Sequence, residues 1–100
     1  MFIKNHNYYV YILASKRNGT LYVGVTSRLF NRISQHKIKF YKNSFTAKYN
    51  VNKLVYYERY QYIKDAISRE KELKKWGREW KIKLIEKENS TWRDIYNDIL

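Results

Sequence analysis

The chain of 100 residues contains no cysteine and no proline, and it has only three glycines. The absence of cysteine excludes disulfide bonds, thiolate zinc sites and a thiol nucleophile. No apolar run is long enough to cross a membrane as a helix, and residues 1–10 lack the apolar stretch of a secretory signal peptide. We therefore expect a cytoplasmic protein that does not enter a membrane, folded as a single domain over residues 1–100.

Acidic residues are also few: 9 Asp and Glu stand against 21 Lys and Arg, which gives a formal net charge of +12. A small domain with this imbalance repels itself unless it meets a polyanion. Nucleic acid is the first candidate partner, because Lys and Arg bind phosphates with release of counterions. A membrane surface is the second candidate, and a generally basic composition without such a partner is the remaining alternative.

Three segments alternate in polarity and are rich in β-branched and aromatic residues, which predicts strands at 8–15, 20–26 and 53–60. The turn signal Asn18–Gly19 lies between the first two strands and predicts a hairpin. Helical spacing at 26–40 and 63–88 completes the order β-β-α-β-α-α. This order predicts an α+β fold, in which a three-stranded antiparallel sheet is flanked by helices.

The two helical regions carry their own boundary signals. Thr26 or Ser27 is the expected N-cap of the first helix, and Gly77 is the expected C-cap that divides the second region into two helices. Residues 42–52 are polar and typical of a loop. The side chains expected to face inward are Leu29, Ile33, His36, Phe40, Ile63, Ala66, Ile67, Leu73, Trp76, Trp80, Leu84 and Ile85, and Trp92, Ile95 and Leu100 are expected to pack back on the body.

Two tyrosines of the hairpin are candidates for a site. A four-residue "KRNG" loop places Leu13 opposite Tyr22 and Tyr11 opposite Gly24, which makes the two tyrosines diagonal neighbours on one face. Gly24 leaves space in front of the Tyr11 ring because it has no side chain. The alternative is ordinary sheet packing, since tyrosine is abundant in this chain at 11 residues.

Arg32 and His36 add to this candidate site. They are four residues apart and therefore lie on one face of the first helix. Arg32 borders the buried stripe that begins at Leu29, and its guanidinium matches the oxygens of a phosphate. The alternatives are a surface arginine whose stem covers Leu29 and a histidine that only packs.

Glu70 is a carboxylate on an apolar stripe, between Ile67 and Leu73. A buried carboxylate is costly unless it is paired or binds a metal. One interpretation is an ion pair with a buried arginine such as Arg32. The other is a ligand for Mg²⁺, which prefers oxygen donors and often needs only one or two carboxylates. The neighbours of Glu70 that we expect to face solvent are Arg69, Lys71 and Glu72.

The first helix and the following loop combine basic and aromatic residues. The lysines expected to bind phosphates are Lys37, Lys39, Lys42 and Lys48. Tyr41, Phe45 and Tyr49 are interleaved with them, which suits single strands or flaps whose bases stack on aromatic rings. The alternative places these rings in the core, and it is favoured for Phe45.

Together these residues resemble the GIY-YIG nuclease superfamily, which takes its name from two short motifs on a hairpin. The first motif reads Tyr9-Val10-Tyr11 here and the second reads Tyr22-Val23-Gly24, with the corresponding tyrosines eleven residues apart. Tyr9 replaces the family's first Gly, and Val replaces Ile at positions 10 and 23. The resemblance extends over residues 8–95 and implies the α+β fold already predicted.

Later positions match the same family in order. Arg32 lies ten residues after Tyr22 and matches the family's helix arginine, and His36 matches a frequent His or Tyr one turn later. "AISREKELKKW" is similar to the family helix that bears the metal-binding glutamate, here Glu70. "FTAKY" and "LVYYE" resemble the small stand-alone branch related to the N-terminal domain of the excinuclease C subunit. Asn89 matches a late polar residue that supports the site.

The resemblance implies hydrolysis of a phosphodiester that depends on Mg²⁺ or Mn²⁺ and leaves a 5′-phosphate and a 3′-hydroxyl. Glu70 is the implied metal ligand, and Gly24 and Asn89 are supporting residues. The implied catalytic residues are Tyr11, Tyr22, Arg32 and His36. We expect a structure-selective or non-specific DNA endonuclease with a role in DNA repair, RNA being the other possible substrate. The alternatives are a nucleic-acid-binding module with this fold and little cleavage, and a basic interaction protein.

Overall fold

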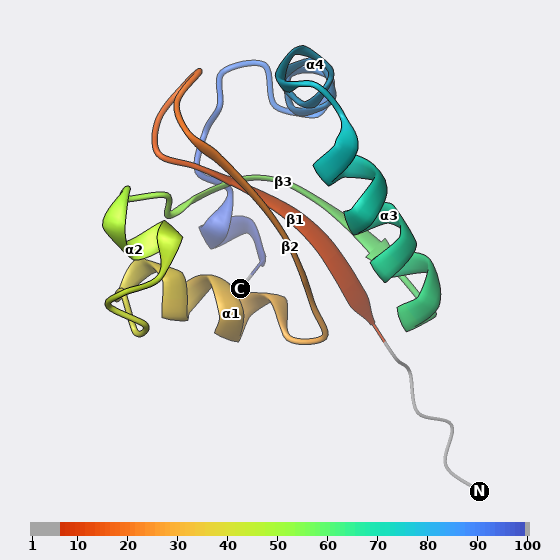
Figure 1. The fold of residues 1–100 in the computed structure, drawn as a ribbon, viewed down its shortest axis with the longest axis horizontal. Helices are drawn as coiled ribbons and strands as arrows, with labels where there is room; N and C mark the ends of the chain where they lie inside the picture. The colour runs from red at the N-terminus through yellow and green to blue at the C-terminus, as the bar shows by residue number, and fades with distance from the viewer. Residues whose placement is uncertain (1–6, 100) are drawn as a thin grey trace, which may run out of the picture.

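The structure, a computed structural model, describes residues 7–99 and contains a three-stranded antiparallel sheet between two groups of helices (Figure 1). This architecture confirms the predicted α+β fold. The strands are in the order β2-β1-β3, and no helix in the described range is long and apolar enough to cross a membrane. The elements are β1 (Tyr8–Ala14), β2 (Leu21–Thr26), α1 (Leu29–Lys37), α2 (Phe45–Lys48), β3 (Lys53–Tyr60), α3 (Ile63–Lys75), α4 (Arg78–Glu88) and the 3₁₀ helix η1 (Tyr96–Ile99).

The central strand β1 is covered on both faces, because its side chains alternate between two cores. Val10, Ile12 and Ala14 belong to a core that includes residues of α3 and α4. Tyr11 and Leu13 belong to the opposite core, which includes residues of α1 and the tail. Figure 1 shows the same division, with α3 and α4 on one side of the sheet and α1 and α2 on the other. Tyr11 therefore faces α1.

The hairpin has the predicted register. Leu13 pairs with Tyr22 and Tyr11 pairs with Gly24. Asn18 adopts a left-handed conformation with φ 57°, which asparagine tolerates better than most residues. The guanidinium of Arg78 donates to the carbonyls of Asn18 and Gly19 and so attaches the turn to α4. Turn chemistry and loop length together fix which side chains share the α1 face.

A β-bulge interrupts the pairing of β1 with β3. Ile12 pairs with Tyr56, but the next residue of β1 pairs with Leu54, so Val55 is the extra residue. Its carbonyl accepts a hydrogen bond of 3.1 Å from the Asn89 side chain. A bulge leaves a backbone group unpaired, and Asn89 provides the missing partner for this carbonyl.

The tail after α4 returns along the bulged strand. Ile95 donates its backbone N–H to the Leu54 carbonyl, and the Leu54 N–H donates to the Asp94 side chain. Asp94 also accepts a hydrogen bond from the ammonium of Lys37, at the end of α1. Trp92 is buried, as predicted, whereas the prediction for Leu100 falls outside the described residues. The tail thus joins β3 to α1.

The first helix is shorter than predicted. It spans Leu29–Lys37, and Arg28 occupies its N-cap position without a side-chain hydrogen bond, so neither Thr26 nor Ser27 caps it. Phe40 lies beyond its C-terminus and is exposed, which corrects its predicted inward position. The expected loop at 42–52 contains α2, whose first turn is capped by the Ser44 side chain through a hydrogen bond from Ala47 N–H.

The second helical region differs from the prediction in the role of Gly77 between α3 and α4 and in which side chains face the core. Gly77 is the N-cap of α4, and Trp76 is the C-cap of α3. Ile63 and Trp80 are exposed by 50% and 61%, so neither faces inward. Of the other side chains predicted to face inward on α3, Ala66 and Leu73 are buried as predicted, whereas Ile67 is exposed. In α4, Leu84 and Ile85 belong to the core as predicted.

Candidate active site

Tyr11 lies at the centre of a polar cluster on the α1 face of the sheet. Its side chain is 1% exposed, and its hydroxyl oxygen shares a hydrogen bond of 3.1 Å with Nε2 of His36. A Cβ atom at residue 24 would lie 2.4 Å from this hydroxyl, well inside van der Waals contact. Gly24 is therefore required by the position of the Tyr11 ring, as the hairpin register predicted.

His36 connects Tyr11 to the short helix α2. Its Nδ1 shares a hydrogen bond of 2.9 Å with the hydroxyl of Thr46, so both ring nitrogens have partners. Burial lowers the pKa of His36 to about 4, and the positive charge of Arg32 acts in the same direction. The imidazole is therefore neutral at physiological pH, with one nitrogen that donates and one that accepts.

Tyr22 and Arg32 form the open side of the cluster. The Tyr22 ring centroid lies 6.3 Å from that of Tyr11 and 5.7 Å from that of His36. The Arg32 guanidinium donates to the Gln35 side chain and is 5.5 Å from the centroid of the Tyr41 ring. Tyr22, Arg32 and His36 all line a pocket of about 210 Å³. A ligand in this pocket would reach the cationic group directly.

The electrostatics of Tyr11 depend on its neighbours from two helices. Burial raises the pKa of Tyr11 to about 12; a hydrogen bond to Arg32 and its positive charge oppose the rise, while Tyr22 and Glu70 add to it. The phenol is therefore protonated at neutral pH. The negative charge of Glu70 on α3 is the smallest of these contributions.

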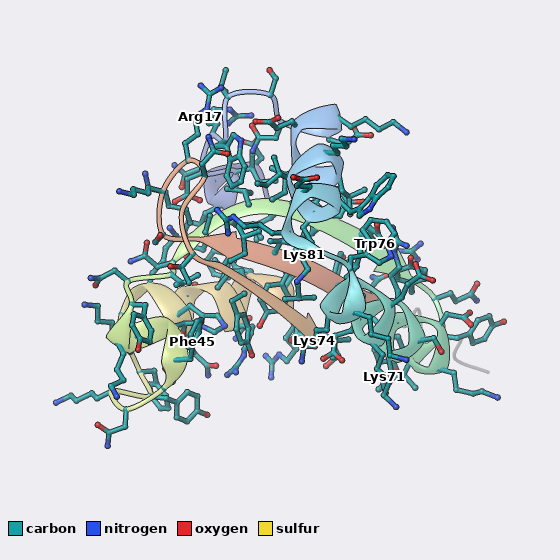
Figure 2. All side chains as sticks on the ribbon, turned by 45° about the horizontal axis from the view of Figure 1, so that its top comes forward. Arg17, Phe45, Lys71, Lys74, Trp76 and Lys81 are labelled. Atoms are coloured by element: carbon teal, nitrogen blue, oxygen red, sulfur yellow. The ribbon has the colours of Figure 1, made fainter. Side chains whose placement is uncertain are left out.

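Glu70 is mostly covered, with a side chain 16% exposed, but it is not paired with Arg32. Its carboxylate accepts a hydrogen bond of 3.3 Å from the ammonium of Lys74, one turn later on α3. The predicted partner for the ion-pair interpretation was therefore wrong. Figure 2 shows Lys71 and Lys74 projecting from α3, while Phe45 projects from α2.

A family model described as the GIY-YIG catalytic domain matches residues 7–83 of this chain. The chain belongs to the GIY-YIG family. It is also similar in structure to a UPF0213 protein from Bacillus halodurans solved by NMR in solution, with 26% sequence identity and a TM-score of 0.55. The match covers 88% of this chain and 92% of that one. A search of curated proteins finds no match.

GIY-YIG nucleases act on nucleic acid and generally depend on a divalent cation. Among residues 7–99 no three His, Cys, Asp or Glu side chains form a group suited to a metal ion. This does not conflict with Mg²⁺ or Mn²⁺, because Mg²⁺ keeps several of its waters and is often held by one or two carboxylates. The oxygen donors of Glu70 fit such an ion. The Lys74 ammonium would have to leave the carboxylate when the ion binds.

The four predicted phosphate-binding lysines lie in two different settings. Lys39 lines the 210 Å³ pocket, and Lys42 and Lys48 are exposed nearby in sequence. Lys37 instead points toward the tail, where its ammonium donates to Asp94 and to the Asn52 carbonyl. Its charge is already neutralised there. Three of the four predicted lysines are thus accessible, and one of them, Lys39, lines the pocket.

Asn89 supports the fold at a distance from the tyrosine cluster. Its amide donates to the carbonyls of Val55 and Arg93, and its side-chain oxygen accepts from the Arg93 N–H. These contacts hold the bulge and the tail. Within the described residues, no hydrogen bond joins Asn89 to Tyr11 or its neighbours.

Two features of the site were not predicted. Thr46 orients His36, and Lys74 covers the Glu70 carboxylate. The second had a sequence signal, because residues four apart on a helix are neighbours and opposite charges at this spacing pair. The first had none, because Thr46 reaches His36 only after α2 folds back over α1.

Proposed function

We propose that this protein is a divalent-cation-dependent DNA endonuclease, either structure-selective or without sequence preference, that works in DNA repair. The observation that carries the proposal is one cluster in which Tyr22, Arg32 and His36 line a single pocket and the buried Tyr11 hydroxyl is hydrogen-bonded to His36. The net charge of +12 supports a polyanionic substrate. We propose the cytoplasm as the place where the protein meets nucleic acid.

In the proposed reaction a water molecule attacks the scissile phosphorus and the bond to the 3′ oxygen breaks. The products are a 5′-phosphate and a 3′-hydroxyl. Arg32 stabilises the negative charge that develops on the phosphate, because a positioned cation in a partly buried site acts more strongly than one in water. Tyr22 donates a hydrogen bond to a phosphate oxygen. Glu70 would hold the divalent ion, which would supply positive charge to stabilise the leaving group.

Tyr11 and His36 act on the attacking water. A phenol with a pKa of about 12 is a poor base by itself, so Tyr11 orients the water through its oxygen. The neutral Nε2 of His36 accepts a hydrogen bond from the Tyr11 hydroxyl, which leaves the phenol oxygen free to accept one from the attacking water. The proton that the water loses passes through solvent to the 3′ oxygen. Thr46 supports this role because its hydroxyl oxygen accepts a hydrogen bond from Nδ1–H in the required tautomer.

The test is nicking of supercoiled plasmid and of a branched DNA in Mg²⁺, with Mn²⁺ as a second ion. The wild type and Glu70→Ala are prepared identically, and Glu79→Ala serves as a control that removes an exposed carboxylate from α4. We expect cleavage by the wild type and the control and none by Glu70→Ala, with equal thermal stability of all three. Cleavage by Glu70→Ala at the wild-type rate would contradict the proposal, and an RNA of the same branched shape decides between DNA and RNA.

A nucleic-acid-binding module that retains the fold but cleaves poorly is the second candidate. It is favoured by the pairing of Glu70 with Lys74, which leaves the carboxylate neutralised in the free protein. For this candidate we expect salt-sensitive DNA binding by the wild type and by Glu70→Ala alike, and no cleavage by either in Mg²⁺ or Mn²⁺.

A further inference from the structure

The 210 Å³ pocket has an aromatic wall that the proposed reaction does not use. Its outer side is formed by Phe40 and Tyr41, which follow α1, and by Phe45 of α2. These three rings are exposed by 57%, 54% and 46%, although burial of apolar surface is favourable. The pocket therefore presents apolar ring surface directly beside the cationic Arg32.

A defined turn holds two of these rings in place. Lys39 has φ 54°, a left-handed conformation that costs free energy for a residue with a Cβ atom. The Lys39 N–H donates to the carbonyl of His36, and the Phe40 N–H donates to that of Gln35. This is the hydrogen-bond pattern of a Schellman motif, normally formed with glycine. It turns the chain at the end of α1, so Phe40 and Tyr41 belong to the pocket wall instead of a longer helix.

The third ring, that of Phe45, is held in place by its contact with Tyr22. Phe45 stacks on Tyr22, with centroids 6.4 Å apart and planes inclined by 29°. α2, which carries Phe45, is tied to α1 by the hydrogen bond between Thr46 and His36. Strained backbone and fixed rings at a site are typical of functional surfaces. The wall is consequently preorganised in the free protein.

The chemistry of this wall matches one nucleotide. Aromatic rings stack on any nucleobase because each base has a π face, and a neighbouring arginine attracts the attached phosphate. The pocket is smaller than the roughly 300 Å³ of pockets that take drug-sized ligands, so it suits a single ring system. A base inside a duplex already stacks on both faces and cannot enter.

We propose that this pocket binds one unpaired base of a nucleic-acid strand, next to the phosphate at Arg32. The substrate class is then a single strand, a flap or another junction with unpaired nucleotides, and a blunt duplex is excluded from full binding. The position of the phosphate rests on the function proposed above, but the binding of the base does not require cleavage. The two proposals therefore fail separately.

The experiment compares two strands of equal length and charge by fluorescence anisotropy in EDTA. One is a short thymidine oligonucleotide and the other is the same backbone with an abasic residue at every position. The ratio of their dissociation constants is measured for the wild type, Tyr41→Ala and Phe45→Ala. Tyr62→Ala is the matched control, because Tyr62 is 63% exposed and does not line the pocket.

We expect the wild type and Tyr62→Ala to prefer the strand with bases. In Tyr41→Ala and Phe45→Ala this preference falls by roughly 5- to 150-fold, the change produced by loss of one base–aromatic stack. Equal binding of both strands by the wild type, including no binding of either, would overturn the proposal. So would an unchanged preference in both pocket variants. Thermal unfolding of each variant shows that the exposed substitutions leave the fold intact.

The result is independent of the cleavage assay. If the wild type cleaves DNA but binds both strands equally, the endonuclease proposal stands and the base pocket fails. If the pocket variants lose their preference while the wild type cleaves nothing, the base pocket stands and the endonuclease proposal fails.

Discussion

The two faces of the sheet each carry a cluster of two tyrosines and an arginine, and the clusters differ in one partner. On the α3 face, Tyr56 and Tyr60 donate to the Glu58 carboxylate, which also receives two hydrogen bonds from Arg69. On the α1 face, Tyr11 and Tyr22 surround a neutral histidine, and within the described residues Arg32 has no carboxylate partner. In the first cluster the arginine is paired with a carboxylate. In the second cluster the arginine is unpaired among the described residues, so the cluster carries a positive charge.

The electrostatics follow from this difference. Burial alone would raise the pKa of Glu58, but the hydrogen bonds from Arg69 and the two tyrosines outweigh it, and the pKa lies below its usual range. Within the described residues no carboxylate pairs with Arg32 on the α1 face, so this arginine remains available to a phosphate. Similar residue types therefore produce stability on one face and a candidate active site on the other, and the deciding factor is whether the cation is already paired.

The largest expected effect concerns the arginine of the α1 face. Arg32→Ala is expected to lower the cleavage rate by about 10²–10³-fold, because it removes the positioned cation that stabilises the transition state. Plasmid nicking at saturating DNA measures the change, and Arg17→Ala, which removes an exposed arginine from the hairpin loop (Figure 2), is the control. An equal loss in both variants would show that only total charge matters.

Arg69→Ala should lower the stability of the fold, whereas Arg32→Ala lowers the cleavage rate. Its removal leaves the partly buried Glu58 carboxylate without its cation, so we expect the free energy of unfolding to fall by about 3 kcal/mol. Urea unfolding at pH 7 measures it, and Arg32→Ala in the same experiment should change little. A stable Arg69→Ala protein would remove the distinction between the two clusters.

Acidification should remove the stability contributed by the two clusters over different pH ranges. The pKa of His36 is about 4 in the folded protein against an ordinary 6.5, so the unfolded chain binds this proton more tightly. The free energy of unfolding should therefore fall by up to about 3 kcal/mol as the pH drops from 6.5 to 4. The lowered pKa of Glu58 contributes stability that is present above pH 4.5 and lost below it. Urea unfolding at a series of pH values measures both effects. His36→Gln should remove the pH dependence of the free energy of unfolding only between pH 6.5 and 4, and Glu58→Gln should remove it only below pH 4.5.

The smallest effect tests the lysine on the metal-binding candidate. Lys74→Met removes the ammonium from Glu70 and is expected to tighten Mn²⁺ binding about twofold, since exposed pairs one helical turn apart contribute roughly 0.3–0.5 kcal/mol. Titration calorimetry of the free protein measures it. Lys71→Met removes the same charge from a neighbouring exposed position, and equal tightening in both variants would assign the effect to net charge.

The features predicted correctly from the sequence are local. The Asn-Gly turn and the even loop length determine the hairpin register, and this alone brings Tyr11, Tyr22 and Gly24 together. Strand positions and the family motifs follow from residue patterns within short windows. These regularities depend on backbone geometry that neighbouring residues impose, so no tertiary information was needed to predict this half of the candidate site.

The rotation of α3 was not predictable in this way. Ile63 and Ile67 suggested a buried stripe, but in the structure Arg69 turns toward the sheet because Glu58, eleven residues away on β3, accepts its hydrogen bonds. The prediction that Arg69 faces solvent was therefore wrong. The core position favoured for Phe45 was wrong too, because its ring stacks on the outer side of Tyr22. Both outcomes depend on partners that no local pattern identifies.

Asp94 of the tail, which contacts Lys37 of α1, lies beyond the region that is similar to the family. The family match ends at residue 83, and every residue proposed to act on the substrate lies before that point. Asp94 nevertheless holds the end of α1 through Lys37, across 57 residues of sequence. A fragment cut where similarity ends would keep every residue proposed to act on the substrate and lose the anchor of the helix that carries Arg32 and His36. Sequence similarity to the family therefore ends before the last residues that hold the fold together.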